Sequence, residues 1–468
     1  MQDILATQRA SFMAALPEPL SLRKDRLKRA IAMIRDHAAR FCDALSEDFG
    51  HRSPDQTMVT DIAGSIGPLR HAIKHLDRWA RRDRRPLQFP LGLLGARAWV
   101  EYQPKGVIGV IAPWNFPVNL VMAPLAGVFA AGNRAMVKTS EYTPATAALF
   151  EEIVGEYFDR TELAFISGGP DVGKAFAELP FDHLLFTGAT GIGKHILHAA
   201  ADNLTPVTLE LGGKSPVIVG KGADLAQVGQ RVALGKMLNA GQICLAPDYV
   251  LVPSEREADL VDSLKSAASA MYPTLLSNPD YTSIVNDRHY QRLNAWIDDA
   301  RAKGATVDVV NPAGEDFSST NSRKMPLHIV RDVTDDMTLM QEEIFGPILP
   351  VRRYDGIESA IGEVNRRDRP LGLYYFGPNA DERRRVLDRT ISGGVTLDDV
   401  VFHVSMEDLP FGGVGPSGMG AYHGRDGFIT FSHGKSVFKQ ARLDVAKLAG
   451  LKPPYGATTR KTVARQIG

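Results

Sequence analysis

Short apolar runs alternate with helix-like stretches along most of this 468-residue chain. Strand-like runs at 105–112, 134–138, 181–188, 206–213, 216–220 and 249–253 are separated by helix-like stretches such as 143–157, 190–203 and 224–238. Runs in this order form right-handed crossover units around a parallel sheet. The pattern therefore predicts an α/β fold, with further strands near 327–331 and 347–353.

The two ends of the chain differ from this pattern. Residues 20–50 and 58–82 have the periodicity of amphipathic helices, interrupted by the segment 51–56. Strands are predicted at 97–103 and 434–440, while the basic residues from Ala441 onward predict a surface tail with little core.

Charge and cysteine content exclude several classes of protein. Lys plus Arg and Asp plus Glu both number 54, so the net charge is zero and gives no attraction to nucleic acid or anionic membranes. The only cysteines, Cys42 and Cys244, argue against a disulfide framework and favour a reducing compartment such as the cytoplasm. Prolines and asparagines interrupt the apolar stretch 106–132, which argues against a membrane span. The spacing of the histidines predicts no metal site.

The segment GQICLAP (241–247) places Cys244 after a predicted helix and before a predicted strand. A cysteine in such a place is either a core residue or a thiol that faces a pocket. A catalytic thiol would need a base, a helix N-terminus or a cofactor charge nearby, because an unperturbed thiol is mostly protonated at neutral pH.

The segment ELGGK (210–214) places Glu210 at the end of an apolar strand. A carboxylate there points into the crevice where α/β proteins bind ligands. The alternative is a helix cap or an ion pair with Lys214.

Three more segments predict ligand contacts at the ends of strands. FTGATGIGK (186–194) places Gly188, Gly191 and Gly193 between a strand and a helix, which suits phosphate binding. It lacks the dinucleotide fingerprint, and His195 replaces the hydroxyl that a P-loop requires. Asn115 in PWNFP (113–117) could donate to an oxyanion or serve only a turn. Lys138 and Glu141 in VKTSE (137–141) could face one ligand or only solvent.

Taken in order, these motifs closely resemble the aldehyde dehydrogenase superfamily from about residue 5 to about residue 440. The resemblance rests on PWNFP, FTGATGIGK, ELGGK, GQICLAP, EEIFGP (342–347) and PFGGVGPSGMG (410–420). It implies that Cys244 is the nucleophile, Glu210 the general base, and Asn115 with the Cys244 backbone N–H the oxyanion hole. The implied cofactor contacts are Trp114, Lys138, Glu141, Thr187, Gly188, Gly193, Glu343 and Phe345.

The resemblance also implies an architecture. A parallel-sheet cofactor domain is expected at 1–82 and 100–211, and an α/β catalytic domain at 212–407. A β-strand oligomerisation arm is expected at 83–99 and 421–440, and a C-terminal tail at 441–468. The segments 246–253 and 418–433 resemble the shorter, dimeric class of the superfamily, so a homodimer without a membrane anchor is expected.

The segment EDFGHRSPDQT (47–57) resembles the bacterial coniferyl aldehyde dehydrogenases of that class. The implied reaction is oxidation of coniferyl aldehyde to ferulate with NAD as the cofactor. NADP is the alternative cofactor. A fatty or general aromatic aldehyde is the alternative substrate. A non-catalytic cofactor-binding protein and an acylating dehydrogenase are the rival classes, and the presence of both Cys244 and Glu210 argues against them.

Overall fold

The computed structural model describes residues 1–89 and 91–468, and it confirms the α/β fold. The first sheet has six strands, in the order β15 (Gly418–Met419), β7 (Val207–Glu210), β6 (His183–Thr187), β3 (Val107–Ile111), β4 (Arg134–Lys138) and β5 (Leu163–Ile166). All neighbours in it are parallel except β15, which runs antiparallel to β7. The predicted strand 206–213 ends early, at Glu210.

The order in which the chain adds strands to this sheet reverses in the middle of the sheet. From β3 the chain moves outward to β4 and β5, and it then returns to the other side of β3 to form β6 and β7. Ligands of open α/β sheets bind at the carboxyl ends of the strands where the order reverses. The expected crevice therefore lies beyond the ends of β3 and β6.

Helices cover both faces of this sheet. They are α1 (Gln2–Ala14), α2 (Leu20–Asp36), α3 (Ala38–Phe49), α4 (Pro54–Thr57), α5 (Gly64–Trp79), α6 (Asn119–Ala131), α7 (Pro144–Tyr157), α8 (Pro170–Ala177) and α9 (Thr190–Ala201). Helix α6 is buried from Leu120 to Ala131, as its unbroken apolar sequence requires. Within the described residues, no helix combines the length and apolarity that a bilayer crossing needs.

The N-terminal helices differ from the prediction in two places. The predicted helix 20–50 divides into α2 and α3 because the backbone leaves the helical region at His37. The predicted helix 58–82 begins with a π-helical segment, η1 (Met58–Ala63), before α5. Such π-helical segments often occur at functional sites, and η1 carries the buried carboxylate of Asp61.

The second sheet has seven strands, in the order β10 (Thr306–Val310), β11 (Leu327–Arg331), β12 (Ile348–Tyr354), β9 (Tyr249–Pro253), β8 (Pro216–Val219), β13 (Gly372–Phe376) and β14 (Gly394–Leu397). Only β10 is antiparallel to its neighbour. The accompanying helices are α10 (Leu225–Met237), α11 (Glu257–Met271), α12 (Asp287–Ala302), α13 (Thr338–Gln341), α14 (Ile357–Asn365) and α15 (Ala380–Arg389). Short 3₁₀ segments are η2 (Leu238–Gly241), η3 (Ser254–Arg256) and η4 (Phe402–Ser405).

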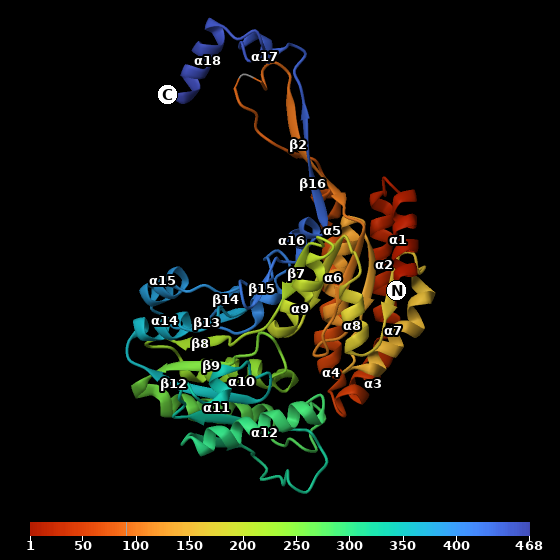
Figure 1. Ribbon diagram of the computed structural model, residues 1–468. Helices are drawn as coiled ribbons and strands as arrows, with labels where there is room; N and C mark the ends of the chain where they lie inside the picture. Colours follow the sequence, from red (N-terminus) through yellow and green to blue (C-terminus); the bar gives the residue numbers. More distant parts are fainter. Residues whose placement is uncertain (90) are drawn as a thin grey trace.

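A narrow arm projects from the body (Figure 1). It consists of β1 (Asp83–Arg84), β2 (Arg97–Pro104) and β16 (Ser432–Lys439), with β2 and β16 antiparallel along their whole length. The predicted strands 97–103 and 434–440 are therefore confirmed. Helix α16 (Gly424–Thr430), just before β16, packs against α5 and α6 in the body.

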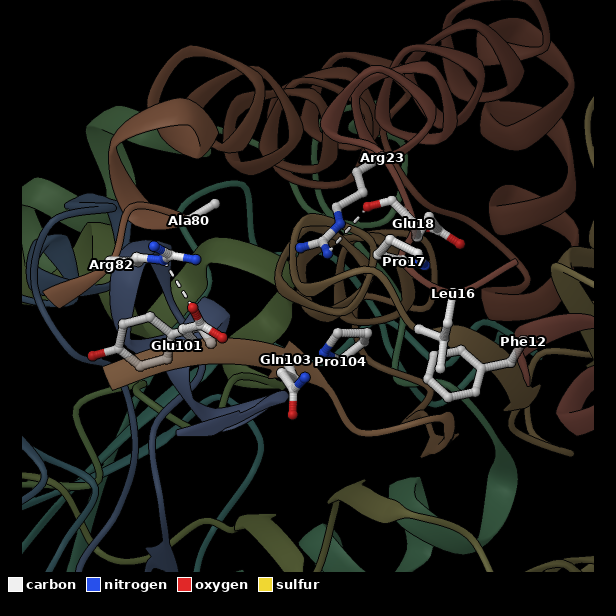
Figure 2. A pocket seen from close by; sticks show the side chains of 11 residues that line it. Phe12, Leu16, Pro17, Glu18, Arg23, Ala80, Arg82, Glu101, Gln103 and Pro104 are labelled. Atoms are coloured by element: carbon white, nitrogen blue, oxygen red, sulfur yellow. Dashed lines mark hydrogen bonds and ion pairs between the residues drawn. The ribbon is translucent and has the colours of Figure 1, made fainter. Parts of the chain in front are cut away.

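The tail beyond the arm forms two short helices, α17 (Val445–Leu448) and α18 (Ala457–Ile467), which have no buried residue. At the base of the arm, a cavity of about 360 Å³ is lined by the α1–α2 turn and by β2 (Figure 2). Arg82 pairs with Glu101 on one side of the cavity, at 2.8 Å, and Glu18 and Arg23 lie on the other. The cavity contains none of the motif residues.

Candidate active site

Four predicted residues lie at or just beyond the carboxyl ends of adjacent strands. Lys138 ends β4, Thr187 ends β6, Glu210 ends β7, and Asn115 follows β3 after a short turn. The register aligns Ile111 with Lys138 and Thr187 with Glu210. These residues therefore lie at one edge of the first sheet, on both sides of the point where the strand order reverses.

Cys244 comes to the same edge from the second sheet, in the loop between η2 and β9. Asn239, Ala240 and Gly241 precede it with φ values of 51°, 51° and 73°, in the left-handed region. A Cβ on Gly241 would lie 2.5 Å from the Gly346 carbonyl oxygen, so glycine is required there. Strained backbone of this kind persists only where its surroundings hold it.

Gln242 holds this strained loop. Its amide donates to the carbonyl oxygens of Asn239 and Ser283, at 2.9 and 3.1 Å, and its side-chain oxygen accepts from the N–H of Val285. The Gln242 side chain is fully buried. The loop therefore presents Cys244 from a fixed backbone.

The side chain of Asn115 contacts the cysteine loop directly. Its Nδ2 donates to the Gln242 carbonyl oxygen at 3.2 Å, and its own backbone carbonyl accepts from Asn239 Nδ2 at 3.1 Å and from Arg52 at 3.0 Å. An amide nitrogen has two hydrogens, so one remains for a ligand. The structure thus brings Asn115 and Cys244 together, as the proposed oxyanion hole requires.

Glu210 and Cys244 lie close enough to perturb each other's ionisation. Burial raises the pKa of Glu210 to about 8, with a further increase from Glu343 and an opposing effect from a hydrogen bond with the thiol. Burial also raises the pKa of Cys244, and the charges of Glu210 and Glu343 add to that rise. At neutral pH both groups therefore hold their protons. Apart from the Cys244 thiol, neither carboxyl oxygen of Glu210 has a hydrogen-bond partner within the described residues.

Glu343 lies against the ELGGK turn. A Cβ on Gly212 would come within 2.2 Å of both carboxyl oxygens of Glu343, so only glycine leaves room for that side chain. Burial, and then the charge of Asp248, raise the pKa of Glu343 to about 8. Asp248 accepts from the backbone N–H of Ile344 at 2.9 Å and pairs with Lys214. The buried ion pair thus ties ELGGK, GQICLAP and EEIFGP together.

A lysine that the motifs did not reveal also lies near this group. Lys236, on α10, is fully buried, and its amine has no hydrogen-bond partner in the described part of the chain. Burial lowers its pKa to about 8, against the attraction of Asp248 and Glu343. Lys236 therefore lies within electrostatic range of two acidic side chains, Asp248 and Glu343.

An aromatic group brings together side chains from the segments of the two sheets. The Trp114 ring lies 5.2 Å from Phe345 and 5.2 Å from His289, and Tyr142 lies 6.5 Å away. Phe345 has a φ of 49°, a second strained position at the site. Burial lowers the pKa of His289 to about 4, which keeps its ring neutral. Flat apolar faces of this kind suit a planar ring.

The end of β6 has the features that a dinucleotide phosphate requires. Thr187 Oγ1 is buried and has no partner in the described residues, and a Cβ on Gly188 would lie 2.6 Å from the Phe186 ring. No side chain caps the N-terminus of α9, whose free N–H groups favour an anion. These residues fit the expected cofactor. Gly193 differs from them, because it packs against Leu211 and allows α9 to lie close to the sheet.

Lys138 and Glu141 differ in exposure. The Lys138 amine is buried and donates to the Thr139 carbonyl at 2.5 Å, whereas Glu141 lies exposed on the turn after β4. Burial lowers the pKa of Lys138, and Glu141 raises it in opposition. Glu141 is thus free to meet a ligand at the rim of the crevice.

Sequence reasoning missed Tyr422 as well as Lys236 and His289. Tyr422 is buried in the core cluster against which Cys244 packs, and both Cys244 and Glu210 influence its pKa. It follows the PFGGVGPSGMG motif by two residues, which was the available signal. Tyr102 packs on Phe428 at the base of the arm, and Val400 and Phe411 are buried in the core.

Comparison with known proteins identifies the family. The aldehyde dehydrogenase family model matches residues 4–437. The chain is 55% identical over its full length, and 96% of the relative's, to a probable coniferyl aldehyde dehydrogenase of Caulobacter vibrioides. It is 53% identical to a coniferyl aldehyde dehydrogenase of a Pseudomonas species, covering 94% of this chain and 90% of the relative.

A solved structure gives the same result. The substrate-bound state of Staphylococcus aureus AldH superposes with a TM-score of 0.91 at 35% identity, covering 99% of each chain. The match extends over both sheets and the arm. On the family model, the relatives and the fold together, the chain belongs to the aldehyde dehydrogenase family and oxidises an aldehyde.

Proposed function

We propose that this enzyme oxidises coniferyl aldehyde to ferulate with NAD, through a thioester on Cys244. NADP is the alternative cofactor. The proposal rests on one observation. Cys244, Glu210 and Asn115, which belong to three different motifs, lie near one another at the carboxyl edge of the first sheet. The substrate rests on the named activities of the two bacterial relatives.

The chemistry begins at the thiol. Only a thiolate attacks a carbonyl carbon readily, and Glu210, in the fraction of molecules where it is ionised, is the nearby carboxylate that can receive the proton of Cys244. As the aldehyde oxygen gains negative charge, the free hydrogen of Asn115 Nδ2 and the Cys244 N–H donate to it. A nicotinamide cofactor, when bound, would supply the acceptor for the hydride that oxidation removes.

Hydrolysis of the thioester then needs a base. Once Glu210 has released the thiol proton to solvent, a water molecule that gives its proton to Glu210 attacks the acyl carbon, and the acid leaves as the Cys244 thiolate is regenerated. Thr187, Gly188 and the N-terminus of α9 would hold the pyrophosphate, and Glu343 and Phe345 would hold the nicotinamide end. Lys138, Glu141 and Trp114 complete the proposed cofactor contacts, with Gly193 as the packing residue behind them.

Apolar side chains on the core cluster against which Cys244 packs support an aromatic aldehyde. Phe116, Leu238, Val401 and Val404 are partly buried and pack on the same cluster as the cysteine. A rigid planar aldehyde loses less entropy on binding than a flexible alkanal. The alternative substrate is a medium or long-chain fatty aldehyde.

Kinetics with coniferaldehyde, benzaldehyde, hexanal and decanal test the substrate. Coniferaldehyde should have the highest kcat/KM. A tenfold higher value for decanal, about 1.4 kcal/mol of transition-state binding, would contradict the aromatic substrate and leave the family assignment intact.

The proposed assembly is a homodimer in the cytoplasm, with the domain boundaries of the sequence prediction. Strand β16 pairs on one side with β2, and its other edge has no partner strand in the described residues. Such an edge favours pairing with another chain. The two cysteines are free, which suits a reducing compartment. Light scattering should give twice the mass of one chain, and a monomer or tetramer would overturn the dimer.

A further inference from the structure

The segment 51–57, between α3 and η1, supplies no reacting group, yet its residues contact the loops that carry the site. The backbone carbonyl of His51 accepts from the N–H of Ser283 at 3.0 Å. The next residue, Arg52, donates to the Asn115 carbonyl at 3.0 Å. The segment therefore connects the turn that carries the oxyanion residue with the loop that contains Ser283.

Gln56, in the same segment, holds Asn239 by two hydrogen bonds. The side-chain oxygen of Gln56 accepts from the backbone N–H of Asn239 at 3.1 Å, and its Nε2 donates to Asn239 Oδ1 at 3.3 Å. The hydroxyl of Thr282 donates to the same Gln56 oxygen at 3.4 Å. An amide that bonds both the backbone and the side chain of one residue fixes the position and the orientation of that residue.

The backbone of Gln56 is itself fixed by its neighbours. Its N–H donates to the Oγ of Ser53, the N-cap of α4, at 3.2 Å. Its carbonyl accepts from Thr60 Oγ1 at 2.8 Å, and Arg52 donates to that hydroxyl at 3.3 Å. Gln56 and Arg52 thus belong to one turn, and the side chains of both are directed at the site loops.

Asn239 needs such support because its backbone is strained. Its φ of 51° lies in the left-handed region, and so does that of Ala240, which follows it. A non-glycine residue keeps this conformation only where its surroundings hold it. The two hydrogen bonds from Gln56 are part of those surroundings.

The side chain of Asn239 in turn orients Asn115. Asn239 Nδ2 donates to the carbonyl oxygens of Asn115 and Gln242, at 3.1 and 3.2 Å. Asn115 Nδ2 donates to the same Gln242 carbonyl at 3.2 Å. The backbone and the side chain of Asn115 are therefore both tied to the loop that Asn239 begins, and these bonds set the direction of the second Asn115 amide hydrogen.

The direction of that hydrogen decides how well an oxyanion is stabilised. A donor is effective when it is aimed beforehand at the position that the oxyanion will occupy, and a misplacement of about 1 Å can slow a reaction on the order of a hundredfold. If Asn239 relaxed from its left-handed conformation, its bonds to Asn115 and Gln242 would change. The donor of the oxyanion hole would then move.

We propose that Gln56 is a positioning residue of the oxyanion hole, which acts through Asn239 on the side-chain amide of Asn115. Gln56 takes no part in bond making or proton transfer. It keeps Asn239 in the conformation in which the free hydrogen of Asn115 Nδ2 meets the developing oxyanion. This inference rests on the proposed function, in which that oxyanion forms on the acyl carbon bound to Cys244.

Hydrolysis of p-nitrophenyl acetate without cofactor tests this role. The ester acylates Cys244 and releases nitrophenol in a burst, whose amplitude counts intact sites, and the steady rate that follows is hydrolysis of the thioester. Gln56→Met keeps the length of the side chain and removes both hydrogen bonds. It should lower the burst rate constant by about tenfold. The steady rate should fall by a similar factor, because hydrolysis passes through an oxyanion in the same place.

The amplitude of the burst separates positioning from folding. In Gln56→Met it should stay at the wild-type value per site, because the sites are intact and only slower. Gln230→Met, which changes an exposed glutamine on α10, is the matched control and should equal wild type in amplitude and in both rates. Gln56→Asn withdraws the amide by one methylene group and should show the same loss. It decides the question if Gln56→Met does not fold.

A double variant shows whether the effect passes through Asn115. Asn115→Ala removes the donor that Gln56 is proposed to aim. Adding Gln56→Met to Asn115→Ala should therefore slow the burst further by less than about twofold, because the two changes act on one interaction.

Three results would overturn the positioning role of Gln56. They are burst and steady rates of Gln56→Met within twofold of wild type, a smaller burst amplitude at an unchanged rate constant, and an equal slowing by Gln56→Met with and without Asn115. A burst from Cys244→Ala in the same assay would instead refute the proposed function.

Discussion

The guanidinium of Arg52 pairs with the carboxylate of Asp61 at 2.6 Å, and both side chains are completely buried. The pair fixes the turn that carries the oxyanion residue. Arg52 donates to the Asn115 carbonyl at 3.0 Å, and Asp61 accepts from the N–H groups of Val118 and Asn119 at the start of α6. The buried pair thus positions the amide that we propose for the oxyanion hole.

Arg52→Ala should destabilise the protein by about 3–5 kcal/mol, because it leaves Asp61 as an uncompensated buried charge. Urea unfolding measures the loss. Arg384→Ala is the control: Arg384 forms an exposed pair with Asp388 on α15, which should contribute nothing measurable. Equal midpoints for wild type and Arg52→Ala would show that the pair is dispensable.

Cys244→Ala should abolish aldehyde oxidation while cofactor binding is retained. Cys42→Ala should be nearly silent in activity, because Cys42 lies on α3 with its thiol directed at the Pro54 carbonyl, 3.7 Å away. Reduced-cofactor absorbance and fluorescence titration measure the two properties. Oxidation by Cys244→Ala would remove the thiol from the mechanism.

Hydrolysis of the thioester should accelerate with pH. Glu210 acts as a base only when ionised, and burial followed by the charge of Glu343 holds its pKa at about 8. The hydrolytic rate should rise about tenfold per pH unit below pH 8 and level off above it. Glu343→Gln should move the midpoint to lower pH in the cofactor-free ester assay. A flat profile from pH 6 to 9 would contradict the assignment.

NAD should be preferred over NADP. Glu141, exposed on the turn after β4, would accept hydrogen bonds from the adenosine ribose and repel a 2′-phosphate. Glu141→Gln should therefore raise kcat/KM for NADP relative to NAD by about fivefold. Glu152→Gln, which removes an exposed carboxylate on α7, should not. A wild type that favours NADP would count against this role of Glu141.

The sequence predicted the strands well because most of them are short, continuous apolar runs that end in polar residues. Lys138, Thr187 and Glu210 all mark strand ends, which explains why their shared edge was foreseeable. The order of the motifs indicated the family, and the family resemblance predicted that Cys244 acts together with Glu210.

Features that depend on long-range packing were not foreseeable. The left-handed positions Asn239 and Ala240 carry no sequence signal of their own, since Gln242 and Asn115 hold them through the fold. Lys236 reads as the polar residue of an amphipathic helix, yet it is fully buried. Tyr422 joins the core cluster against which Cys244 packs only through the fold.

The proposed reaction passes through a covalent acyl intermediate on Cys244 that Glu210 helps to hydrolyse. Glu210→Gln removes the base and keeps the shape of the side chain. Intact-protein mass spectrometry after mixing this variant with NAD and coniferaldehyde measures the intermediate directly. We expect a burst of one NADH per site and a feruloyl adduct on Cys244 that persists while turnover is slow. Turnover at the wild-type rate with no adduct on Cys244 would contradict this mechanism.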